Sequence, residues 1–74
     1  MNLTLLKSEI DESKFTKNEI AEYLGITRQG FYNKLNGTKE FKASEVKKLS
    51  QILNLSSKRF NEIFFNDYVD KNAN

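Results

Sequence analysis

The sequence lacks cysteine, histidine, proline and tryptophan altogether. Without cysteine or histidine, the chain has no disulfide, no Cys/His metal site, no imidazole base and no thiolate nucleophile. Long apolar runs are also missing, because the longest strongly apolar run is Ile63-Phe64-Phe65 and a membrane-spanning helix needs about 20 apolar residues. The first residues lack the basic and apolar segments of a signal peptide. We therefore expect a cytoplasmic binding protein that uses no cofactor and is not an enzyme.

Charge is distributed unevenly along the 74 residues. The chain has 12 Lys and Arg and 10 Asp and Glu, which gives a net charge of +2. Residues 26–42 carry four bases and one acid, or +3, whereas residues 1–15 and 16–25 each carry −1 and residues 43–74 carry +1. This central concentration of positive charge is where a nucleic-acid footprint would lie. The alternative is an ordinary solvated surface that carries lysines.

Helical periodicity runs through the whole sequence, and strand alternation hardly occurs. The apolar spacing predicts helices at about 3–12, between Thr16 and Gly25, at 28–36, at 43–53, and after a cap at Ser56 or Ser57. A chain of this length is one domain. We expect residues 1–74 to form a single compact all-α domain, with residues 70–74 as a frayed tail. Its core should consist mainly of the six phenylalanines and the aliphatic stripes.

The most informative stretch is residues 17–37, KNEIAEYLGITRQGFYNKLNG. Thr16 and Glu19 have the spacing of a capping box, Gly25 can take the positive φ that ends a helix, and Thr27 can cap the next helix. Phe31 and Leu35, an i, i+4 pair, should face inward. The residues left on the outer side are Arg28, Gln29, Tyr32 and Asn33. Arg can bond guanine, Gln and Asn can bond adenine, and an aromatic ring can touch a thymine methyl.

These residues resemble the phage repressor and Cro type of helix-turn-helix regulator, over about residues 3–65. The resemblance implies a five-helix, lambda-repressor-like DNA-binding domain with its helix-turn-helix at about 17–36. It also implies a sequence-specific transcriptional regulator, of a phage or mobile element, that acts in the cytoplasm of a bacterial host at the nucleoid. Such a protein would insert its third helix into the major groove of double-stranded operator DNA and occlude a promoter.

By matching position, the base-contacting residues would be Arg28, Gln29, Tyr32 and Asn33. Contacts to the DNA backbone would come from Lys17, Thr27, Lys34, Asn36, Thr38, Lys39 and Lys42. Two positions depart from the family pattern. Lys34 stands where an apolar residue is usual, and Lys42 stands where a capping hydroxyl is expected.

One small domain contacts few base pairs, so we expect a homodimer on the DNA. Phe64, Phe65, Tyr68 and Val69 would spread over roughly 140° of a helix, wider than the usual inward stripe, and are candidates for the dimer contact. Alternatively, they close the core against the first helix. A second hypothesis from another class is a protein-binding modulator, similar to an antirepressor, that uses the same fold to contact a regulator protein. The modest net charge and the apolar C-terminal segment motivate it.

Overall fold

The computed structural model describes residues 1–65, which form five α-helices and no strand. The helices are α1 (Leu3–Glu12), α2 (Lys17–Leu24), α3 (Arg28–Leu35), α4 (Ala43–Ile52) and α5 (Ser57–Phe64). The prediction of a compact all-α chain with five helices is confirmed, and the first four helices end within a residue of the expected positions. The tail expected at 70–74, and with it Tyr68 and Val69, lies outside the described residues.

Four of the five helices begin at a residue whose side-chain oxygen caps the first turn. Asn2, Thr16, Thr27 and Ser56 each accept a hydrogen bond from the backbone amide three residues later. These bonds satisfy amides that have no partner within the helix. In α2 the Glu19 carboxylate also accepts from the Thr16 amide, at 2.8 Å, so the predicted capping box is confirmed.

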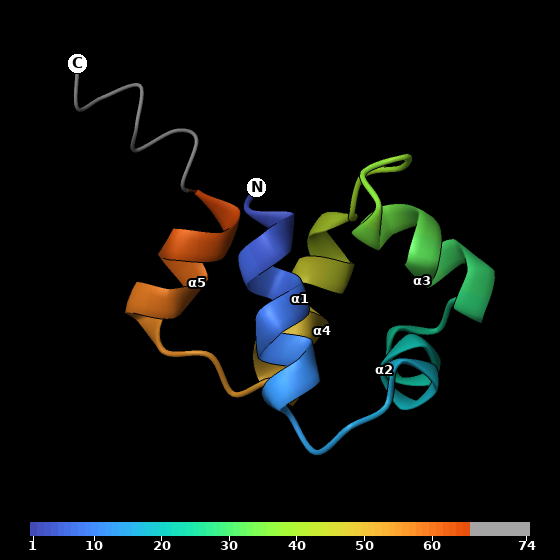
Figure 1. The fold of residues 1–74 in the computed structure, drawn as a ribbon, viewed down its shortest axis with the longest axis horizontal. Helices are drawn as coiled ribbons and strands as arrows, with labels where there is room; N and C mark the ends of the chain where they lie inside the picture. The colour runs from blue at the N-terminus through green and yellow to red at the C-terminus, as the bar shows by residue number, and fades with distance from the viewer. Residues whose placement is uncertain (66–74) are drawn as a thin grey trace.

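The helices are arranged around one core. α2 packs against α3 and α4, and α1 packs against α5. In Figure 1, α5 lies at one end of the long axis, α2 and α3 lie at the other end, and α1 and α4 lie between them. The Asn2 amide donates to the Ile63 carbonyl at 2.6 Å, which ties the start of the chain to α5. No helix within residues 1–65 is long and apolar enough to cross a bilayer.

The core is mainly aliphatic. Its buried members are Leu6, Ile10, Ile20, Ala21, Leu24, Phe31, Leu35, Leu49 and Ile63. Of the core expected from the six phenylalanines and the aliphatic stripes, the aliphatic part is confirmed, whereas the phenylalanine part is wrong because Phe31 alone among the six is fully buried. Phe15 and Phe41 lie in connecting segments at the rim of the core, and the other three lie in or just after α5, where Phe65 is 49% exposed. Aromatic residues at helix ends close the edge of the core rather than fill it.

Candidate nucleic-acid interface

A short turn between α2 and α3 fixes the direction of α3. Gly25 has φ of 78°, a left-handed conformation that glycine adopts without strain. Its amide donates to the carbonyls of the last turn of α2, and the Ile26 amide donates to the Ala21 carbonyl at 3.1 Å. Two residues after Gly25, the Thr27 hydroxyl already caps α3 by accepting from the Gly30 amide at 3.0 Å. The chain therefore passes from α2 to α3 in three residues, and hydrogen bonds close the end of α2 and the start of α3.

The inner face of α3 is held by apolar contacts. Phe31 is fully buried and Leu35 almost so, as the i, i+4 spacing predicted. The Phe31 ring meets the Phe41 ring edge-on, with centroids 6.2 Å apart. Phe41 belongs to the segment that connects α3 to α4, so this aromatic pair fastens that segment to α3. These contacts hold one side of α3 against the core, and the opposite side is at least partly exposed to solvent.

The outer face of α3 consists of Arg28, Gln29, Tyr32 and Asn33. Arg28 and Gln29 are exposed, and Tyr32 and Asn33, one turn later, are half-buried. Arg28 Nη2 donates to Tyr32 Oη at 3.3 Å, and Gln29 Nε2 donates to Asn33 Oδ1 at 3.1 Å. The structure thus places all four predicted base-contacting residues on one surface and links them in two pairs along the helix.

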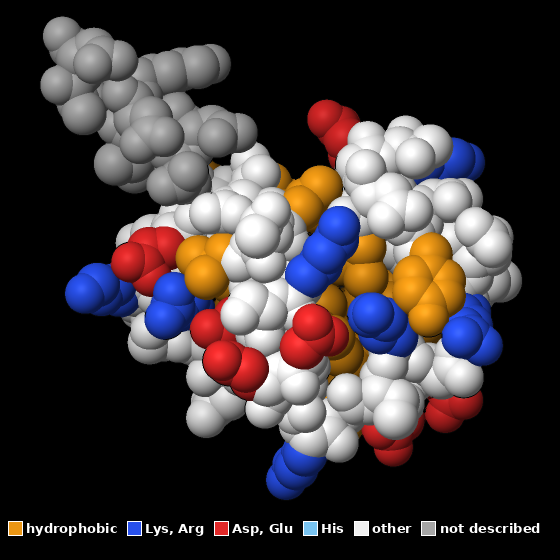
Figure 2. Space-filling view, viewed as in Figure 1, with side chains coloured by type: hydrophobic (Ala, Val, Ile, Leu, Met, Phe, Trp, Pro, Cys, Tyr) orange, Lys and Arg blue, Asp and Glu red, His pale blue; other side chains and the backbone are white. Residues whose placement is uncertain are grey.

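Tyr32 lies close to two cations. The Arg28 guanidinium is 5.4 Å from its ring centroid, and the Lys17 ammonium, which comes from the first turn of α2, is 5.7 Å away. The hydrogen bond from Arg28, with the charges of Arg28 and Lys17, lowers the pKa of the Tyr32 phenol against an opposing effect of desolvation. Figure 2 shows an apolar side chain flanked by blue groups on the α2–α3 side of the molecule. An anion approaching this side would meet both cations together.

The predicted backbone-contacting residues divide between two hollows. Thr27, Lys39 and Lys42 line a shallow groove between the start of α3 and the segment before α4, together with Asn33, predicted to read bases, and the acidic Glu40. Lys17 lines a second hollow together with Arg28, Tyr32 and Asp11, whose acidic side chain was not anticipated there. Of the remaining residues predicted to contact the backbone, Asn36 and Thr38 are exposed at the end of α3. Except for Lys34, the predicted cations and hydroxyls are at least partly accessible at this end of the molecule.

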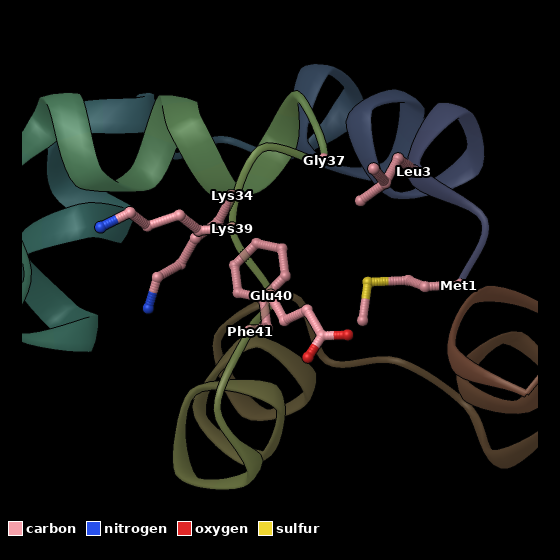
Figure 3. A pocket seen from close by; sticks show the side chains of 7 residues that line it. All are labelled: Met1, Leu3, Lys34, Gly37, Lys39, Glu40 and Phe41. Atoms are coloured by element: carbon pink, nitrogen blue, oxygen red, sulfur yellow. The ribbon is translucent and has the colours of Figure 1, made fainter.

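Lys34 was predicted to contact the DNA backbone, but the structure buries it and pairs its ammonium within the protein. Its ammonium contacts both carboxylate oxygens of Glu45, at 2.5 and 2.7 Å. Lys34 is 9% exposed and Glu45 4%. An ammonium already paired within the protein cannot also neutralise a phosphate without leaving a buried carboxylate unpaired. Lys34, Lys39, Met1 and Leu3 are among the residues that line a cavity of about 300 Å³. In Figure 3 the side chains of Lys34 and Lys39 extend away from Met1 and Leu3.

Glu45 is the residue of this region that the sequence reasoning missed. It lies in the first turn of α4, and its carboxylate also accepts from the Lys42 amide at 2.8 Å. The Glu45 amide, which a hydroxyl at position 42 would have capped, donates to the Lys42 carbonyl at 3.0 Å. A single carboxylate therefore bonds the backbone at the start of α4 and the ammonium at the end of α3. Burial alone would raise the pKa of Glu45, but the bonds from Lys34 and the Lys42 amide, with the two lysine charges, lower it below its usual value. The Glu-at-N3 spacing after Lys42 was the available signal.

The candidate dimer surface differs from its expected form. α5 ends at Phe64, and Phe65 has a non-helical backbone with φ −121° and ψ 15°. The interpretation of Phe64, Phe65, Tyr68 and Val69 as one continuous helical surface is therefore wrong at Phe65. Instead, the Phe60 ring contacts the rings of Phe64 and Phe65, with centroids 4.9 and 5.7 Å away. We call Phe60, Phe64 and Phe65 the α5 aromatic cluster.

The described residues contain no group of three acidic side chains placed to hold a metal ion. Comparison of the chain with protein-family models, with curated proteins and with solved structures finds no match.

Proposed function

We propose that this chain is a sequence-specific DNA-binding regulator of the phage repressor and Cro type. In this proposal α2, the turn and α3 act as a helix-turn-helix, and α3 enters the major groove of operator DNA to occlude a promoter. The observation that carries it is the outer face of α3. Its four side chains are types that bond base edges, and the buried Phe31 and Leu35 hold that face outward.

The surroundings of α3 support the same function. The groove lined by Thr27, Lys39 and Lys42 borders the start of α3 and offers one hydroxyl and two ammonium groups to a sugar–phosphate backbone. Lys17 offers a cation on the other side, at the N-terminal end of α2, where helix amides favour an anion. Together with Asn36 and Thr38, these residues would set the register of the protein on the duplex, while the outer face of α3 reads the sequence.

The proposal includes a homodimer on DNA, because one domain of this size reads few base pairs and a two-fold dimer doubles the contacts. The α5 aromatic cluster is the candidate contact, and α5 lies at the opposite end of the molecule from α3 (Figure 1). A dimer formed there would leave both copies of α3 uncovered. We place the protein in the cytoplasm of a bacterial host, encoded by a phage or mobile element.

The test starts with selection of bound duplexes from a random pool, followed by affinity measurements on the selected site and on random DNA. Binding should weaken steeply with salt because lysine–phosphate contacts release counterions. Arg28→Ala should weaken the selected site by about 1–3 kcal/mol, the value of a bidentate base contact, and affect random DNA far less. Lys39→Ala should weaken both DNAs similarly and reduce the salt slope by about one.

Two results would contradict the proposal. If Arg28→Ala and Lys39→Ala each lost the same affinity for the selected site and for random DNA, Arg28 would not be reading a base. If the wild-type protein gave no gel shift even at low salt, it would not be a DNA-binding protein. In the second case, the alternative gains support: a protein-binding modulator, similar to an antirepressor, that grips another regulator. The specific observation in its favour is the exposed ring of Phe65. Capture of a defined regulator that is lost in a Phe65→Asp variant would establish it.

A further inference from the structure

The outer face of α3 is organised as two side-chain pairs. Each pair joins a long polar side chain in the first turn to a residue four positions later, a spacing that makes neighbours on a helix. Arg28 is joined to Tyr32, and Gln29 to Asn33. The two residues best suited to bond base edges are therefore held before any DNA arrives.

The hydrogen bond from Arg28 to Tyr32 leaves most of the guanidinium N–H groups available. A guanidinium has five N–H groups, and the Tyr32 hydroxyl takes one of them. Four N–H groups remain, enough for the fork that bonds O6 and N7 of guanine. The Tyr32 ring also lies near the Lys17 ammonium of α2, which adds a contact from outside the helix to the residue that orients Arg28.

The Gln29–Asn33 pair leaves Gln29 with one donor and one acceptor that could bond adenine. One Nε2 hydrogen of Gln29 is donated to Asn33 Oδ1. The other hydrogen and the Oε1 acceptor stay available, and a bidentate contact to adenine N7 and N6 uses one donor and one acceptor of this kind. The intrahelical bond therefore fixes the amide without consuming the groups that would read the base.

We propose that Tyr32 and Asn33 are positioning residues, which hold Arg28 for a guanine and Gln29 for an adenine in neighbouring base pairs of the operator half-site. The two bases should be neighbours because Arg28 and Gln29 are consecutive at the start of α3. Holding these side chains beforehand reduces the rotamer freedom lost on binding. This inference rests on the proposed DNA-binding function and revises the roles of Tyr32 and Asn33 from base contact to support.

The test compares specificity profiles of variants on duplexes selected by the wild-type protein. Tyr32→Phe keeps the ring and removes the oxygen that accepts from Arg28. Tyr23→Phe is the matched control, because Tyr23 is an exposed tyrosine on α2. Arg28→Ala should abolish the preference for guanine at one base pair, and Tyr32→Phe should weaken the same preference by about 2- to 10-fold. Gln29→Ala and Asn33→Ala should act on the adjacent pair, and Tyr23→Phe should change neither.

A modified probe makes the test sharper. Replacing the selected guanine with 7-deazaguanine removes the N7 acceptor, so the wild-type protein should lose affinity and Arg28→Ala should be indifferent to the replacement. The loss should be smaller for Tyr32→Phe than for the wild type. Thermal unfolding of each variant, expected at the wild-type midpoint, shows that the fold is intact.

Three results would overturn the inference. An unchanged profile for Tyr32→Phe removes its positioning role. A loss of affinity when a thymine is replaced by uracil, abolished by Tyr32→Ala but not by Tyr32→Phe, makes the ring a direct contact to a thymine methyl. Failure of the wild-type protein to select any duplex overturns the proposed function itself, and with it this inference. The first two results, by contrast, leave the proposed function standing and remove only the positioning role of Tyr32.

Discussion

α3 and α5 have the same length but opposite surfaces. Each has eight residues, and each begins after a hydroxyl residue that caps its first turn. α3 buries Phe31, Lys34 and Leu35 and turns polar side chains outward. α5 fully buries Ile63 alone, and the Phe60 ring contacts those of Phe64 and Phe65 in tilted and edge-on arrangements.

The difference indicates what each end of the molecule can bind. The polar side chains of α3 already have hydrogen-bond partners on the helix, so they offer a defined pattern of donors and acceptors to a polar ligand. The rings of the α5 aromatic cluster have no such pattern and gain free energy by leaving water. One end suits directional recognition and the other suits apolar association.

The largest expected effect separates two phenylalanines that belong to these two ends. Phe31→Ala should lower the free energy of unfolding by about 3–5 kcal/mol, because a fully buried ring is lost and a cavity remains. Phe65→Ala should lower it much less, because half of that ring is already in water. Urea unfolding followed by circular dichroism measures both. Similar losses would show that the ring of Phe65 is as deeply packed as that of Phe31.

The ion pairs that fasten each helix give the next prediction. Glu45→Ala should destabilise the fold by about 3 kcal/mol, because it leaves the Lys34 ammonium buried without its partner. Glu9→Ala is the matched control. It removes the Arg59 contact between α1 and α5 at 3.1 Å, a pair with a partly exposed arginine that is worth about 0.2–1 kcal/mol. A Lys34→Met/Glu45→Leu double variant should recover most of the loss. A Glu45→Ala protein as stable as the Glu9→Ala control would contradict this account.

The same ion pair should make the stability of the fold depend on pH under acidic conditions. The pKa of Glu45 is lowered in the folded state, so the unfolded chain binds more protons when acid is added. The stability that this carboxylate contributes is fully present above the ordinary glutamate pKa of about 4.3. This contribution to stability is lost as the pH falls through the lower pKa that Glu45 has in the folded state. Unfolding free energies measured between pH 7 and pH 2 should therefore fall less in the double variant than in the wild type.

The smallest expected effect on stability concerns the surface of α5. Phe65→Asp should leave monomer stability nearly unchanged. In the proposed dimer it would place a charge in an apolar contact and oppose association, which sedimentation equilibrium would detect as a shift towards monomer. Binding to a two-half-site operator should weaken, while binding to a single half-site should not. A wild-type protein that is monomeric at all concentrations and also on DNA would remove the dimer from the proposal.

Much of the fold could be predicted because its signals are local. Thr16 and Glu19 lie three residues apart, Gly25 follows its helix directly, and Phe31 and Leu35 repeat at one turn. Each of these features depends on neighbours within one turn of the chain, so the pattern contains the whole interaction. The outer face of α3 followed from them, because fixing the inner residues determines which ones are left outside.

What the sequence could not supply depends on contacts between distant segments. Lys34 and Glu45 are 11 positions apart, and only the tertiary fold brings them together. The end of α5 at Phe64 was also missed. Its aromatic residues continue the apolar pattern through Phe65, and periodicity does not show where the backbone leaves the helix. For the same reason, the pattern assigned phenylalanines to the core that lie at its edge.

Gly30 constrains which positions of α3 can accept substitutions. A Cβ at this position would lie 3.0 Å from Thr27 Oγ1, the oxygen that caps α3. An alanine would gain about 1 kcal/mol of helix propensity, but it would press on the cap that starts the helix. Under the proposed DNA-binding function, variation in DNA preference is therefore expected at the four outward positions rather than at position 30. A library that randomises those four codons and preserves this glycine would keep the largest share of folded members.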